Sequence, residues 1–62
     1  MSPARDELVS LAWDIDQTVD RLYHLSEVFA DIGLDAESDY WNGEAKELQE
    51  TLTRVRSMVK TA

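Results

Sequence analysis

The chain has 62 residues with thirteen acidic and six basic side chains, a formal net charge of −7 and no cysteine. It is short enough for one domain at most, and no disulfide stabilises it. No apolar run approaches the ~18 residues of a membrane span, and a net negative chain has no general attraction for phosphate backbones or anionic lipid. We therefore expect a cytoplasmic protein that binds neither membranes nor nucleic acid directly.

The first predicted element is a long helix over residues 3–32. Ser2 suits the N-cap, Pro3 suits the first helical position, and acidic residues follow in the first turn. Apolar residues then recur three and four apart over four heptads, and only Thr18 interrupts the series. The stripe consists of Leu8, Leu11, Ile15, Leu22, Leu25, Phe29 and Ile32, and is widened by Ala12 and Val19.

A short turn is predicted over residues 33–37. Gly33 stands where the C′ residue of a helix would lie, and Leu34 is placed to make the hydrophobic contact of a Schellman-type end. The first helix should therefore stop near Ile32.

The second helix is predicted over residues 36–60, with two competing starts. Asp35 is one possible cap, and Asn42, just before Gly43, is another. The earlier start is favoured because the four-three apolar spacing continues through this segment, and a glycine inside a helix costs only ~1 kcal/mol. The stripe of this helix contains Trp41, Ala45, Leu48, Leu52, Val55 and Val59.

Together these elements predict an all-α fold, an antiparallel helical hairpin. A compact monomer of this size gains about 90 kcal/mol from apolar burial, and ordering the chain costs about the same. Two hairpins that pair into a dimeric four-helix bundle would bury the remaining apolar surface. The predicted dimer core comprises Leu8, Leu11, Ile15, Leu22, Leu25, Phe29, Ile32, Trp41, Leu48, Leu52, Val55 and Val59.

Charge is distributed unevenly along the predicted hairpin. The turn end is strongly acidic, whereas residues 48–62 carry three bases and one acid. In an antiparallel hairpin this basic end returns beside the start of the first helix. The expected charge matching is between Arg54, Arg56 and Lys60 on one arm and Asp6, Glu7 and Asp14 on the other.

No residue pattern predicts catalysis, a cofactor or a metal site. His24 is the only histidine, and its heptad position lies outside the apolar stripe, as for a solvated residue. The chain has no Ser/His/Asp set, no glycine-rich phosphate loop and no cysteine. We expect a protein that is not an enzyme and has no small-molecule substrate.

One short motif resembles a known family. Trp41-Asn42-Gly43 is similar to the Trp-x-Gly signature of the WXG hairpins, small secreted proteins that place this motif at the bend between two helices. The resemblance implies a small assembly or secreted hairpin protein as an alternative function.

Trp13 fits the apolar pattern least, because it lies on the side of the first helix opposite the stripe. It either serves as an exposed anchor for a protein partner or packs in a higher oligomer. The residues predicted to bind the partner are Val9, Trp13, Asp16, Asp20, Tyr23 and Glu27.

The leading hypothesis is a non-catalytic interaction module. It would be a small acidic regulator, inhibitor or adaptor that forms a homodimer and binds a second protein with a basic surface. An alternative is a nucleic-acid mimic, whose rows of acidic side chains block a DNA- or RNA-binding enzyme.

Overall fold

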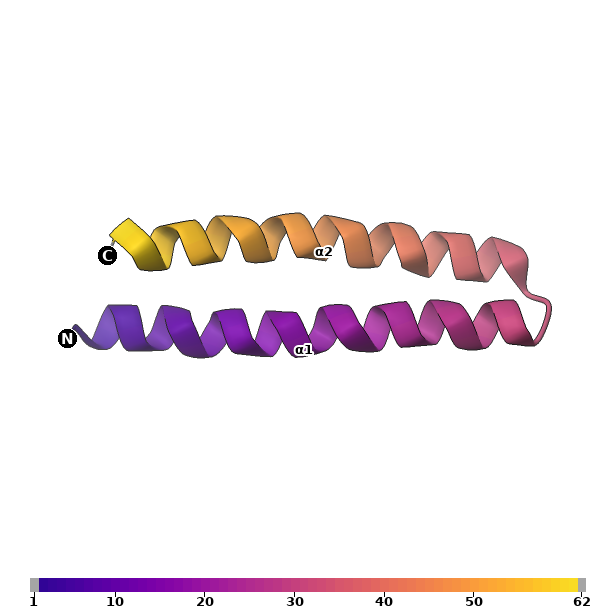
Figure 1. Cartoon of the computed structure of the whole chain (residues 1–62), viewed down its shortest axis with the longest axis horizontal. Coiled ribbons are helices and arrows are strands. Elements are labelled where there is room, and N and C mark those ends of the chain that lie inside the picture. Colours follow the sequence, from indigo (N-terminus) through magenta and orange to yellow (C-terminus); the bar gives the residue numbers. More distant parts are fainter. Residues whose placement is uncertain (1, 62) are drawn as a thin grey trace.

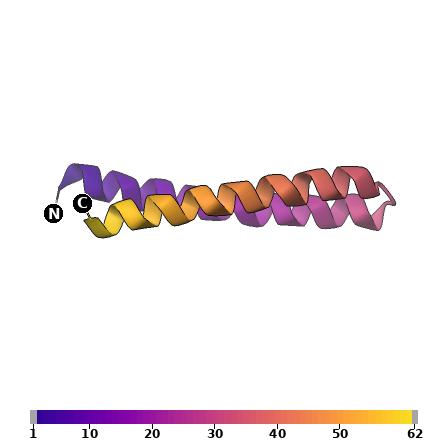
Figure 2. The same cartoon turned by 90° about the horizontal axis from the view of Figure 1, so that it is seen from above.

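The computed structural model describes residues 2–61, which form two long α-helices joined by a short turn (Figure 1). Helix α1 spans Pro3–Asp31 and helix α2 spans Asp35–Thr61. The helices run antiparallel, so the two ends of the chain lie together, and from above they cross at a shallow angle (Figure 2). The predicted all-α helical hairpin is therefore confirmed.

The start of α1 is capped by the residue that precedes it. The Ser2 hydroxyl accepts a hydrogen bond from the Arg5 backbone N–H at 3.2 Å, and the Ser2 carbonyl accepts one from Asp6 at 3.2 Å. Pro3 occupies the first turn, where its missing N–H leaves no intrahelical bond unmade. Local sequence alone therefore accounts for this helix start.

The end of α1 is a Schellman motif. The Leu34 N–H donates to the Phe29 carbonyl at 2.9 Å, and the Gly33 N–H donates to the Ala30 carbonyl at 3.1 Å. Gly33 has φ +83°, a left-handed conformation that glycine adopts without steric cost. As a result α1 ends at Asp31, and the chain reverses within three residues.

Helix α2 takes the earlier of the two candidate starts. The Leu34 carbonyl accepts the first helical hydrogen bond, from the Ser38 N–H at 2.9 Å, so Asp35 is the first helical residue rather than the cap. Acidic residues in this first turn interact favourably with the positive end of the helix dipole. Gly43 lies inside α2 with open space on its side-chain side, and the helix continues through it.

The two arms meet along a seam in which the buried positions recur every seven residues. On α1 the buried residues are Ala12, Val19 and Ser26; on α2 they are Ala45 and Leu52. Small side chains at these positions let the backbones approach closely, while the full-sized Leu52 is completely buried. Ala12 and Val19, predicted at the margin of the apolar stripe, are therefore at the centre of the contact between the helices.

A polar contact fixes the register of this seam near the turn. The buried Ser26 hydroxyl donates to the Ser38 carbonyl at 2.8 Å and lies 3.1 Å from the Ser38 hydroxyl. A slip of one residue would break this hydrogen bond between the helices. The pair therefore favours one alignment of α1 on α2.

The hairpin is an elongated rod with Cα extents of 48 × 14 × 10 Å. Its radius of gyration is 14.4 Å, against about 10.6 Å for a compact domain of this length. It exposes 4679 Å² of surface, against about 4,100 Å² for a globular monomer of this mass. Two helices alone therefore leave apolar surface uncovered.

Within the described residues, no helix combines the length and the apolar character needed to cross a membrane.

The two glycines provide a matched test of the turn. Gly33→Ala should lower the free energy of unfolding by about 1 kcal/mol, because alanine is strained at a left-handed position. Gly43→Ala should raise it by about 0.5–1 kcal/mol, because alanine stabilises a helix interior where space is open. Urea unfolding followed by circular dichroism at one protein concentration measures both, and equal effects would contradict this turn geometry.

Candidate interaction surfaces

One side of the hairpin carries an apolar surface that runs along both arms, which we call the open face. Its residues from α1 and from α2 lie on the same side of the seam, because a shallow depression lined by Leu22 and Leu48 spans the two helices on that side. On α1 the large side chains at the heptad position next to the seam are only half-buried. Those at the next heptad position away from the seam are exposed or half-buried. The open face comprises Leu8, Leu11, Ile15, Leu22, Leu25, Phe29, Ile32, Trp41, Leu48, Val55 and Met58.

The exposure on the open face is substantial within one chain. Leu11 is 51% exposed and Ile32 is 63% exposed, although both continue the leucine stripe. The predicted dimer-core residues thus divide into two groups. Leu52 is buried within the single hairpin, whereas the residues of the α1 stripe retain surface that no other part of residues 2–61 covers.

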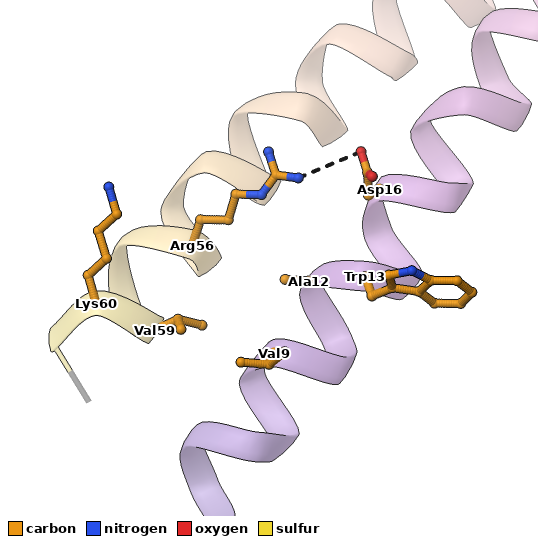
Figure 3. Close-up of a pocket in the computed structure, with 7 residues that line it drawn as sticks. All are labelled: Val9, Ala12, Trp13, Asp16, Arg56, Val59 and Lys60. Atoms are coloured by element: carbon orange, nitrogen blue, oxygen red, sulfur yellow. Dashed lines mark ion pairs between the residues drawn. The ribbon is translucent and has the colours of Figure 1, made fainter. Parts of the chain in front are cut away.

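The opposite side of the seam carries a groove of about 400 Å³ near the chain ends, which we call the terminal groove (Figure 3). Val9 and Val59 point toward one another between the helices, while the Trp13 ring projects away from α2. The indole is 64% exposed. The groove is lined by Val9, Ala12, Trp13, Asp16, Arg56, Val59 and Lys60.

An ion pair bridges the helices at the inner end of the terminal groove. Arg56 Nη2 lies 3.8 Å from Asp16 Oδ1, with the two side chains 55% and 41% exposed. A pair this exposed is screened by water and contributes at most about 1 kcal/mol. The basic end of α2 does return beside α1, but the carboxylate it meets is Asp16 rather than Asp6, Glu7 or Asp14.

The six residues predicted to bind a partner form two adjacent rows on this side of α1. Trp13, Asp20 and Glu27 share one heptad position and are exposed. The other row lies nearer α2; in it Asp16 is held by the ion pair and Tyr23 is half-buried. The structure brings three of the six together in the terminal groove: Val9, Trp13 and Asp16.

Sequence reasoning did not place any α2 residue in this groove. The structure adds Arg56 and Lys60 to its wall, and Val59, predicted for the dimer core, lies at its floor. The signal that would have found them is the antiparallel pairing itself, since residues just to one side of each seam must meet across the helices. The α1 side of the groove therefore carries one carboxylate, that of Asp16, and the α2 side carries two bases.

The Trp-x-Gly motif lies inside α2 rather than at the bend. The turn is complete by Leu34, and Trp41 follows in the second turn of the helix. Trp41 is half-buried on the open face and makes an edge-to-face contact with Tyr40, with ring centroids 5.1 Å apart. Trp41 is therefore an apolar residue of the α2 stripe, near the turn.

Among the described residues, no group of three or more histidine or carboxylate side chains is arranged to hold a metal ion. No protein-family model, curated protein or solved structure matches the chain.

Substitution of one exposed and one buried residue distinguishes surface from core. Trp13→Ala should change the free energy of unfolding by less than about 0.5 kcal/mol, because the indole is mostly exposed. Leu52→Ala should cost about 2–4 kcal/mol, because it leaves a cavity in the seam. Chemical denaturation of both variants measures this, and a large loss for Trp13→Ala would show that the indole packs within the fold or an assembly.

Proposed function

We propose that the protein is a non-catalytic protein-interaction module, a small acidic regulator or adaptor. In this proposal it forms a homodimer through the open face and binds a second protein through the side of α1 that carries Trp13. The observation that supports it is the open face itself, which is apolar along both arms yet only partly buried within one chain. Apolar surface of this extent on a small protein is typical of an interaction site.

A second copy is the occupant that fits the open face. In the plane of its two helices the hairpin has Cα extents of 48 by 14 Å, a projected area of roughly 670 Å² before side chains add to it (Figure 1). This area is of the same order as the ~800 Å² of accessible surface that each partner buries in a stable interface. The two helices are similar in length, so the two helices of a second copy can contact them along their whole extent. Face-to-face packing then gives a four-helix bundle in which each stripe contacts two neighbours.

The Trp13 side remains accessible in such a dimer, because it lies across the seam from the open face. An exposed tryptophan beside an apolar groove is a favourable anchor for a partner protein. Asp20 and Glu27 extend an acidic row beyond it, and acidic rows accelerate encounter with basic surfaces. We therefore propose a partner with a basic surface.

Dimerisation is tested by a matched pair of charge substitutions near the same end of α1. Leu11 and Val9 are 51% and 50% exposed, but they lie on opposite sides of the hairpin. Leu11→Asp should weaken the dimer by at least ~100-fold, since each copy would bury an unpaired carboxylate. Val9→Asp should leave the dimer unchanged, and sedimentation equilibrium from nanomolar to micromolar concentration measures both.

A wild-type chain that sediments as a monomer at micromolar concentration while fully helical would disprove the dimer. Leu22→Asp is a more severe variant, because Leu22 is already half-buried within one chain. We expect it to abolish helicity and association together. Retained helicity and association would place the interface on another face.

Partner binding is tested by salt and by Trp13→Ala once a binding protein has been captured from the host. An anchored interface predicts that Trp13→Ala weakens binding by ~30-fold or more, with a modest effect of ionic strength. Nucleic-acid mimicry predicts the reverse: a steep loss of affinity with salt and little effect of Trp13→Ala. Titration calorimetry at two salt concentrations separates them, and Leu34→Ala, at the far end of the hairpin, is the control.

A further inference from the structure

The distribution of charge along the hairpin points to the orientation of the two copies, an inference that rests on the proposed dimer. We propose that the copies pack head to tail, with the turn of each hairpin beside the chain ends of the other. In this arrangement α1 lies on α1 of the second copy and α2 lies on α2.

The two ends of the rod differ sharply in charge. The turn end, residues 24–44, carries six acids and no base. The opposite end, residues 2–13 and 55–61, carries two acids and three bases. Parallel packing would gather both acidic ends at one end of the bundle, whereas head-to-tail packing places each acidic end beside a mildly basic one. The axes of packed helices lie about 8–10 Å apart, which is comparable to the screening length of physiological salt, so weaker repulsion between the acidic ends favours the head-to-tail dimer.

The charges along the edges of the open face meet different partners in the two orientations, so they provide a test that distinguishes them. Along the outer edge of α1, Asp14 and Arg21 are one heptad apart and both exposed. Along the edge of α2, Glu47 and Arg54 are likewise one heptad apart, and Glu47 borders the depression at Leu22. Antiparallel pairing of like helices brings Asp14 opposite Arg21 of the second copy, and Glu47 opposite Arg54 of the second copy.

A polar layer at mid-length sets the register. Thr18 and Thr51 interrupt the apolar surface, and the contacts at Asp16–Arg56 and Ser26–Ser38 bracket the level at which they lie side by side. Each hydroxyl is satisfied within its own helix, Thr18 by the Asp14 carbonyl at 3.0 Å and Thr51 by the Glu47 carbonyl at 3.4 Å. Head-to-tail packing centred here places each threonine beside its own copy. A shift by one heptad would instead place Thr18 against Leu11 or Leu25, and Thr51 against Glu44 or Met58.

Distances between spin labels test the orientation directly, because the chain has no native cysteine. Ala36→Cys places a label on the exposed start of α2, and Glu50→Cys places one on its exposed middle. Fourteen residues of helix separate the sites, so Ala36 labels should lie roughly 50 Å apart head to tail and under about 40 Å apart in a parallel dimer.

The Glu50 label separates failure of this inference from failure of the dimer. Its two copies lie near the middle of the bundle in either orientation, so they should give a short distance whenever a dimer forms. A short Glu50 distance with a short Ala36 distance overturns the head-to-tail orientation alone. If no distance between the labels at position 50 is detected at high protein concentration, both the dimer and the orientation are overturned.

Charge exchange at the edge provides an independent test. Asp14→Arg alone and Arg21→Asp alone should each weaken the dimer by ~3–10-fold, by facing like charges across the interface. The double variant should restore wild-type affinity if the copies are head to tail. In a parallel dimer Asp14 would instead face Arg54 of the second copy and Arg21 would face Glu47, so the double variant would bind more weakly than either single one.

Discussion

The close approach of the two helices along the seam determines the rest of this structure. Ala12 and Ala45 allow the backbones to come together, and Val19 and Leu52 fill the space that remains. Each helix commits one heptad position to this contact. Because this position on α1 carries alanine, valine and serine, the larger residues of the α1 stripe lie to one side of the seam, and the hairpin has an apolar face that it does not cover by itself.

The same seam separates two surfaces of different character. The open face is broad, apolar and runs along both helices, which suits contact with another surface of the same shape. The terminal groove is local, with an apolar floor, one carboxylate on the α1 side, two bases on the α2 side and an exposed tryptophan beside it. The proposed dimer and the proposed partner site therefore use separate residues, and substitutions on one side need not disturb the other.

Much of the local structure follows from the sequence. Ser2 and Pro3 specify the start of α1, and Gly33 with Leu34 specifies its end, because capping depends on groups within a few residues of each other. The choice of Asp35 over Asn42 as the start of α2 follows from the unbroken apolar spacing. The exposed position of Trp13 is also readable, since the residue lies opposite the stripe.

The sequence by itself determined two helices, their boundaries to within a residue or two and an antiparallel hairpin, because helix propensity, capping and heptad spacing are short-range properties of the chain. Only the tertiary structure decided that the seam runs through Ala12, Val19 and Ser26 rather than through the leucines, and that Arg56 pairs with Asp16. A stripe three positions wide permits several rotations of one helix against the other. Side-chain size at the point of closest approach and the Ser26–Ser38 hydrogen bond select among them, and both belong to residues far apart in the chain.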